Sequence, residues 1–229
     1  MRTALLVTVF LSGGALMSLE MTGFRLFQPE FGGDIYVWGS LISVFLGGLS
    51  LGAYLGGRLA DRRPAPWKLG VVLAVAGAIT ATLPLYSEGV LDWMFPGAGA
   101  PLPIELRAPD AAPGELAVYL PPDLRLPTLG AGLVLFGAPS LLLGMVSPYA
   151  ARLFVRAMGR LGTGVGKVYG VSTLGSIAGT LGTSFFLVGW MGTRWLLVGN
   201  GLLLVGVGAA LAGVSALWRP AAVDEVQAD

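Results

Sequence analysis

The residue with the clearest chemical potential is Glu20, a carboxylate inside the apolar stretch ALMSLEMTGFRLF at positions 15–27. An ionised side chain at membrane depth costs roughly 2.5 kcal/mol or more, so it persists where a neighbour compensates it or where it has a task. Arg25 lies about 140° further round a helix and is a poor same-face partner. The alternatives are Arg194, a hydroxyl group, water, a cationic ligand, protonation of Glu20 itself, or a purely structural hydrogen bond to a neighbouring helix.

Hydroxyl and tyrosine side chains recur along two other apolar segments at steps of three and four residues. On a helix this spacing places them on one face. Two interpretations follow. Either the hydroxyl groups form hydrogen bonds with backbone carbonyls or a neighbouring helix, or they line a water-filled cavity. The stripes are Tyr36, Ser40, Ser43, Gly47, Ser50 and Tyr54 in one segment, and Tyr169, Ser172, Ser176, Thr180 and Thr183 in the other.

The composition restricts the chemistry to few side chains. Of the 229 residues, 55% are hydrophobic and 12% are charged, and the mean hydropathy is +0.77. Soluble domains carry about a quarter charged residues, so this is the composition of a membrane protein. The absence of Cys and His excludes thiol chemistry, disulfides, imidazole acid–base catalysis and the usual zinc ligands. We expect no metal, no cofactor and no nucleic-acid partner.

Six apolar windows have the length of about 20 residues that crosses a bilayer. They predict a single all-α membrane domain over residues 1–229. A signal peptide is the main alternative for the first window, but a signal peptide's apolar core is shorter. The windows cover about 4–27, 35–57, 68–90, 128–154, 166–190 and 195–217.

The distribution of Lys and Arg predicts the orientation. With the N-terminus inside, the inner segments hold ten of these residues and the outer segments four. We therefore expect a protein of the cell (inner) membrane with both termini cytoplasmic, including the tail at 218–229. The outer loop, 91–127, contains eight prolines and is expected to form either a small β-hairpin or a Pro/Ala-rich loop without regular structure.

Glycines four residues apart form ridges on two of the windows, at Gly48, Gly52 and Gly56 and at Gly175 and Gly179. Such ridges let membrane helices approach closely. We expect each of these two helices to have a packing ridge beside a mildly polar face.

The two halves of the chain share short strings, RLF at 25–27 and 152–154, and VWG at 37–39 with VYG at 168–170. Three spans per half would give the halves opposite orientations. An inverted three-plus-three repeat is a feature of transporter folds, whose sites lie near the midplane where the repeats meet.

The stretch GGRLADRR at 56–63 closes the second window on the expected cytoplasmic side. It resembles the loop between the second and third helices of the major facilitator superfamily. Asp61 can cap the helix or pair with arginines there, so Asp61, Arg58 and Arg62 are candidates for a conformational latch. A generic basic anchor at the anionic leaflet explains the stretch equally well.

Three stretches, LSGGALMSLEMTGFRLF, FGGDIYVWGSLISVFLGGLSLGAYLGGRLADR and GKVYGVSTLGSIAGTLGTSFFLVGWMGTR, resemble the membrane domain of fused major-facilitator-like/spermidine synthase-like proteins. The resemblance implies a half-major-facilitator-like bundle. In that family a cytosolic aminopropyltransferase domain often follows. This chain has no Gly-rich nucleotide loop with downstream acids, so the resemblance implies the membrane module alone. The residues that match the recurring pattern are Glu20, Arg25, Asp61, Tyr169 and Ser176.

These observations favour a module that binds or transports a small cationic solute, such as a polyamine, and that completes a twelve-helix assembly as a homodimer. Tyrosine rings can contact an ammonium group in such a site. The alternative is a non-transporting anchor or regulatory subunit for a cytosolic spermidine synthase-like enzyme. A membrane-embedded enzyme is the weakest hypothesis, because Glu20 is the only acid firmly within a window. The candidate binding residues are Glu20, Arg25, Tyr36, Tyr54, Tyr169, Ser172, Ser176 and Thr180.

Overall fold

The computed structural model describes residues 1–33, 35–62, 64–94, 125–158 and 161–217. In this part the chain is helical between short turns and has no β-strand. Six helical segments are long and apolar enough to cross a membrane, which confirms the all-α class and the six spans. The chain is therefore an integral membrane protein.

The helices extend beyond the predicted windows, because helical hydrogen bonding continues into the polar residues that flank each apolar stretch. The fourth span consists of α4 and α5, and the fifth consists of α6, the π-helix η1 and α7. The elements are α1 (Arg2–Phe31), α2 (Ile35–Arg62), α3 (Pro66–Met94), α4 (Arg125–Gly144), α5 (Val146–Met158), α6 (Leu161–Gly182), η1 (Thr183–Leu187), α7 (Val188–Trp190) and α8 (Thr193–Leu217).

Most of the expected outer loop at 91–127 lies outside the described residues, and so does the tail at 218–229. The expectation of a β-hairpin or an irregular loop therefore stays a prediction. The edges of that loop are helical, because residues 91–94 belong to α3 and residues 125–127 belong to α4.

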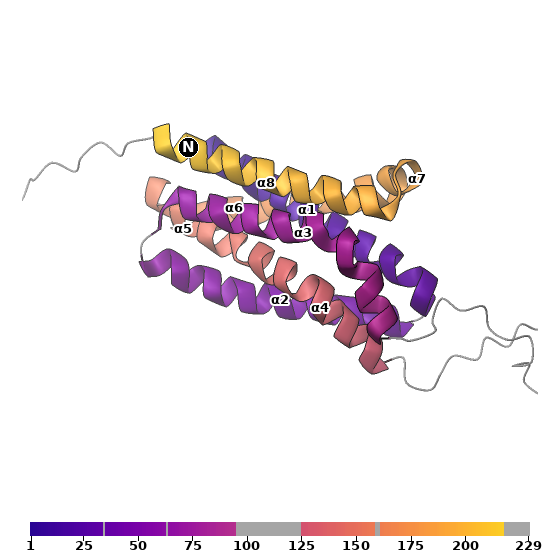
Figure 1. Cartoon of the computed structure of the whole chain (residues 1–229). Coiled ribbons are helices and arrows are strands. Elements are labelled where there is room, and N and C mark those ends of the chain that lie inside the picture. Colours follow the sequence, from indigo (N-terminus) through magenta and orange to yellow (C-terminus); the bar gives the residue numbers. More distant parts are fainter. Residues whose placement is uncertain (34, 63, 95–124, 159–160, 218–229) are drawn as a thin grey trace, which may run out of the picture.

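The helices run along a common axis, and successive spans reverse direction (Figure 1). The start of α1, the turn between α2 and α3, and the end of α8 lie at the same end of the bundle. We call this the basic end, because most of the described Lys and Arg residues lie there. Its basic residues are Arg2, Arg58, Arg62, Lys68, Arg152, Arg156 and Lys167, against Arg25, Arg125 and Arg194 toward the other end.

The predicted glycine ridges of α2 and α6 are confirmed as packing surfaces. On α2, a Cβ atom added to Gly56 would lie 2.6 Å from the Cα atom of Met145 in the fourth span. On α6, Gly179 packs against the backbone of Gly14 on α1, where an added Cβ would lie 2.6 Å from the Gly14 Cα atom. Because only glycine fits at such distances, these ridges fix α2 against the fourth span and α6 against α1.

A third glycine-packed pair, α3 with α8, was not predicted. Gly70 meets Gly208 and Gly77 meets Gly201, so the contacts recur every seven residues along antiparallel helices. An added Cβ on Gly77 would lie 2.5 Å from the carbonyl oxygen of Gly201. These two helices touch backbone to backbone over much of their length.

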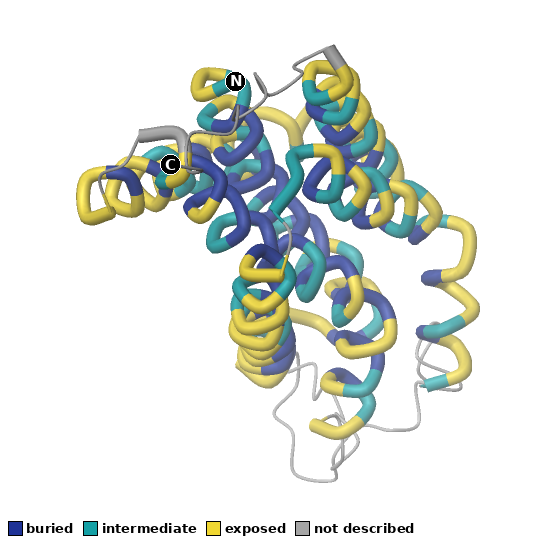
Figure 2. Tube along the Cα trace, turned by 90° about the vertical axis from the view of Figure 1, so that its left-hand side faces the viewer, coloured by how far each residue is buried: buried dark blue, intermediate teal, exposed yellow. Residues whose placement is uncertain are grey.

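Buried residues gather where the helices meet, and exposed residues cover the outer faces (Figure 2). Aromatic rings fill the interior between α1, α2 and α4. Phe136 lies 6.0 Å from Phe27 and 5.6 Å from Phe45 between ring centroids. Tilted rings at these distances pack favourably, so this cluster helps to hold the three helices together.

Two spans are irregular. The fourth is interrupted at Met145, whose N–H donates to the carbonyl of Leu142, three residues back, at 3.2 Å. Pro148, in the first turn of α5, has no N–H group to donate to the carbonyl of Gly144. The fifth span contains the π-helical turn Thr183–Leu187, and such turns are often found at functional sites.

Candidate functional site

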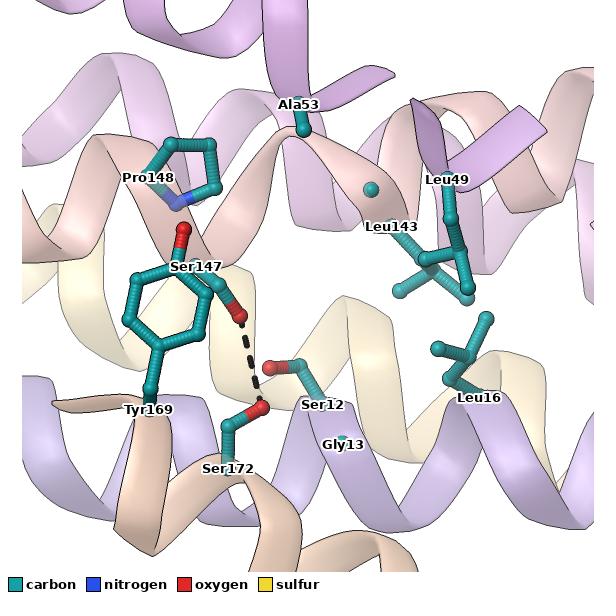
Figure 3. A pocket seen from close by; sticks show the side chains of 11 residues that line it. Ser12, Gly13, Leu16, Leu49, Ala53, Leu143, Ser147, Pro148, Tyr169 and Ser172 are labelled. Atoms are coloured by element: carbon teal, nitrogen blue, oxygen red, sulfur yellow. Dashed lines mark hydrogen bonds between the residues drawn. The ribbon is translucent and has the colours of Figure 1, made fainter. Parts of the chain in front are cut away.

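A cavity of about 190 Å³ lies beside the interruption of the fourth span. Its walls come from α1, α2, α4, α5 and α6, and α2 and α6 lie on opposite sides of it (Figure 3). The lining includes several groups that can bind a polar ligand. These are the side chains of Ser12, Ser147, Tyr169 and Ser172.

The serine hydroxyls in the cavity fill only part of their hydrogen-bonding capacity with other protein groups. Ser147 Oγ and Ser172 Oγ lie 3.3 Å apart and share a hydrogen bond between α5 and α6 (Figure 3). Ser12 Oγ donates to the carbonyl oxygen of Val9 at 3.2 Å, which leaves its lone pairs available. Figure 3 shows the hydroxyl end of Tyr169 directed toward Pro148.

The backbone at the interruption of the fourth span also borders the cavity. Gly144 and Pro148 both line the cavity, and Pro148 cannot donate the helical hydrogen bond to the Gly144 carbonyl. In transporters, carbonyls of interrupted helices coordinate cations. The cavity thus collects uncharged oxygens that suit a small cation or a neutral polar solute. Among the described residues, no group of three or more acidic side chains could hold a metal ion.

A second cavity of about 240 Å³ continues toward the basic end and shares Pro148 and Tyr169 with the first. It is also lined by Asp61 and Arg152, which form an ion pair with 3.2 Å between Oδ1 and Nε. We call the two cavities together the α2–α6 groove, since α2 and α6 border both. The Tyr169 ring lies at the junction between its two parts.

The three latch candidates differ in their partners. Asp61 pairs with Arg152 of α5, whereas Arg58 donates to the Tyr54 hydroxyl at 2.9 Å and lies 5.4 Å from its ring centroid. Arg62 is exposed at the end of α2. Arg152 was not predicted as the partner of Asp61. Its only signal in the sequence was the repeated string RLF, which begins at Arg152 and also at Arg25.

Glu20 is half-buried on α1, one helical turn beyond Leu16, which lines the cavity. It does not line the cavity itself, and it forms no hydrogen bond or ion pair with any residue in the described part of the chain. Arg194, a candidate partner, instead forms an ion pair with Glu88. Arg25 is exposed. Glu20 is therefore not held by a cation within the described bundle.

The remaining candidates are spread over the molecule. Ser176 donates to the carbonyl of Gly13 on α1 at 3.3 Å, whereas Thr180 donates to the carbonyl of Ser176 within α6 at 2.9 Å. Tyr36, toward the other end, accepts a hydrogen bond from Arg125 at 3.2 Å. The structure thus brings Tyr169 and Ser172 together in one cavity, and it keeps Tyr36 and Tyr54 apart from them.

The α2 stripe divides into one buried and several exposed positions. Ser40 is buried and lies within hydrogen-bond distance of Thr128, with 3.0 Å between their hydroxyl oxygens. Ser43, Ser50 and Tyr54 are exposed on the bundle surface. The stripe therefore does not line a closed channel within a single chain.

A buried hydrogen-bond cluster was not predicted, although one of its members, Thr183, belongs to the polar stripe of the fifth window. Ser18 Oγ accepts hydrogen bonds from Thr183 Oγ1 at 2.7 Å and from Asn200 Nδ2 at 2.8 Å. It joins α1 to the π-helical turn and to α8. A further signal in the sequence was Asn200, the only asparagine of the chain, inside an apolar window.

Comparison of the chain with protein-family models, curated proteins and solved structures finds no match.

Proposed function

We propose that this protein is a membrane module that binds a small cationic solute, such as a polyamine, in the α2–α6 groove and moves it along that groove. The observation that carries the proposal is the oxygen-lined cavity at the interruption of the fourth span. Hydroxyl and carbonyl oxygens can replace water around an ammonium group without the cost of burying an anion. Ser12, Ser147 and Ser172 provide the hydroxyls, and the Tyr169 ring offers a cation–π contact.

Acidic residues beyond the cavity supply the attraction for a cation. Glu20 lies one turn past Leu16, and Asp61 lies in the groove's second cavity. A solute that enters from the basic end competes with Arg152 for Asp61. Displacing Arg152 breaks the ion pair between α5 and α2, beside the half-helix that borders the inner cavity.

The helix pairing supports a half-major-facilitator-like bundle with an inverted repeat. Numbered by span, the close pairs are one with five, two with four, and three with six. Exchanging spans one, two and three with four, five and six leaves this set of pairs unchanged, as a repeat requires. The resemblance to the membrane domain of spermidine synthase-like fusion proteins points to the same arrangement.

A homodimer completes the proposal. Ser43, Ser50 and Tyr54 are exposed on α2, although hydroxyls are better placed in a membrane protein where they meet protein or water. A second copy packed over α2 and α6 covers these hydroxyls and closes the groove. The excess of cations at the basic end supports an inner-membrane protein with both termini cytoplasmic.

The second candidate function is a membrane anchor for a cytosolic spermidine synthase-like enzyme. The observation in its favour is the basic end, where Asp61 is the only acidic side chain among the described residues. An acidic enzyme surface could dock there. Co-purification of a synthase with the chain, together with absence of solute binding, would favour this role.

The test is equilibrium binding of labelled spermidine to the purified protein in detergent, followed by uptake into proteoliposomes. Ser147→Ala with Ser172→Ala should weaken binding at least tenfold, since each hydrogen bond to a charged group contributes about 1.5–3 kcal/mol. Glu20→Gln should weaken it as well. Thr82→Ala, which removes an exposed hydroxyl on α3 outside the groove, is the matched control. Saturable binding that neither the paired serine variant nor Glu20→Gln alters would contradict the proposed site.

A further inference from the structure

Glu30 has the most unusual environment of the acidic side chains that the structure describes. It lies in the last turn of α1, at the end of the bundle opposite the basic end (Figure 1). The residue is partly exposed, but its Oε2 atom is buried and has no hydrogen-bond partner. Within the described residues, it is the one side-chain oxygen or nitrogen atom in this condition. A carboxylate with a buried oxygen loses hydration without compensation, so it favours a ligand that restores a hydrogen bond.

The end of α1 adds negative potential at the same place. The helix ends at Phe31, and its last turn contains no basic residue. The C-terminal end of a helix carries a partial negative charge, so an acidic side chain there is unfavourable. A cation beside Glu30 offsets both the carboxylate and the helix end.

The described cations toward this end of the bundle do not neutralise Glu30. Arg125 donates to the Tyr36 hydroxyl at 3.2 Å and lies 4.9 Å from the centroid of its ring. Arg194 forms an ion pair with a residue of α3. Arg25 lies on α1 itself, but it is five residues before Glu30 and about 140° away round the helix. The ion pairs within the described residues do not include Glu30.

We propose that Glu30 is a second station of the solute path, where it binds one ammonium group of the cationic solute. This station rests on the proposed function and extends the path to the end of the bundle opposite the basic end. An ammonium group donates a charge-assisted hydrogen bond to the carboxylate, and its charge offsets the negative end of α1. A divalent metal ion fits less well, because it takes about six oxygen ligands or more and the described residues form no group of three acidic side chains.

The station gives the solute a further countercharge along α1. Glu20 lies ten residues before Glu30, so the two carboxylates are about 15 Å apart along the helix axis. Neither forms an ion pair with another residue of the described part. Conduction through a membrane protein needs several binding positions, each weak enough to release its ligand. The two carboxylates provide such positions, one near the oxygen-lined cavity and one at the end of α1.

The first measurement is the thermal unfolding midpoint of the full chain in neutral detergent without solute. Glu30→Gln should raise the midpoint by about 2–4 °C, because it removes an uncompensated charge from the negative end of a helix. Asp92→Asn is the matched control, since Asp92 is an exposed carboxylate on α3 toward the same end. It should change the midpoint by less than about 1 °C. Equal midpoints for Glu30→Gln and the wild type would overturn the proposal, because the carboxylate would then need no countercharge.

The second measurement is uptake of labelled spermidine by membrane vesicles of known orientation, started from the side that the C-terminal end of α1 faces. Glu30→Gln should lower the initial rate at sub-saturating spermidine by about fivefold or more, because it removes a charge-assisted hydrogen bond. Asp92→Asn should change this rate by less than about twofold, because exposed charges are screened. The equilibrium affinity of the α2–α6 groove in detergent should differ by less than about twofold among the three proteins, since the two sites are distant.

The outcomes separate the station from the proposed function. An unchanged uptake rate in Glu30→Gln, with normal affinity of the groove for spermidine, overturns the station and leaves the proposed function standing. Absence of spermidine binding to the wild type overturns the proposed function and the station with it. Equal losses of uptake in Glu30→Gln and Asp92→Asn also overturn the station, because they would reflect the net charge of that end of the bundle.

Discussion

The α3–α8 pair and the α2–α6 groove show two uses of the same small residues. In the pair, glycines on both helices face each other at seven-residue intervals, and the backbones touch. In the groove, the glycine ridge of α2 faces the fourth span and that of α6 faces α1, so α2 and α6 border a cavity. Because lipid provides no hydrophobic drive for helix association, glycine placement decides where helices close and where a cavity remains.

The largest expected effect comes from breaking the closed pair. Gly77→Leu places a side chain where a Cβ alone would lie 2.5 Å from the Gly201 carbonyl oxygen and 2.7 Å from the Val205 nitrogen. Neither backbone atom can move without separating the helices, so we expect a loss of about 3 kcal/mol or more, or failure to fold. The measurement is the thermal midpoint and monodispersity in detergent.

Gly206→Leu is the control for this prediction, because Gly206 lies on α8 with no atom within 4 Å of an added Cβ. Its midpoint should stay the same or rise, since leucine favours helix over glycine by roughly 0.5–1 kcal/mol. Similar losses at Gly77 and Gly206 would mean that the α3–α8 contact does not hold the bundle together.

An intermediate effect on stability is expected at Ser18, where hydrogen bonds join the fifth span of the α2–α6 groove to α8 of the closed pair. Ser18→Ala removes the acceptor of Thr183 and Asn200, which connect the fifth span to α1 and α8. Hydrogen bonds between membrane helices contribute about 0.6 kcal/mol each on average, so the free energy of unfolding should fall by roughly 1–2 kcal/mol. Denaturation in mixed micelles measures it, with Thr82→Ala on α3 as the exposed control. A loss no greater than that of the control would show that this cluster is not a structural link.

The sequence predicted the six spans and the ridges at Gly48 to Gly56 and at Gly175 and Gly179, because hydropathy and four-residue spacing are local signals. It could not predict the α3–α8 contact, where Gly70 and Gly208 are far apart in the chain. It also identified the Tyr169 and Ser172 face but not Ser12 or Ser147, whose role depends on where the fourth span is interrupted. Long-range geometry decides such contacts, and a single sequence carries no record of it.

The smallest expected change in stability concerns the mouth of the groove, where Asp61 and Arg152 have side chains that are 68% and 43% exposed. Exposed ion pairs contribute about 0–1 kcal/mol, so Asp61→Asn and Arg152→Gln should leave the thermal midpoint almost unchanged.

If the groove is the path of a cation, the two variants should nevertheless differ in solute binding. Arg152→Gln frees a carboxylate and should strengthen binding, whereas Asp61→Asn removes that carboxylate and should weaken it. A double-mutant cycle on affinity measures the coupling between the two residues. Equal affinities in both variants and the wild type would show that the ion pair merely joins α2 to α5, and that the groove differs from the closed α3–α8 pair in packing alone.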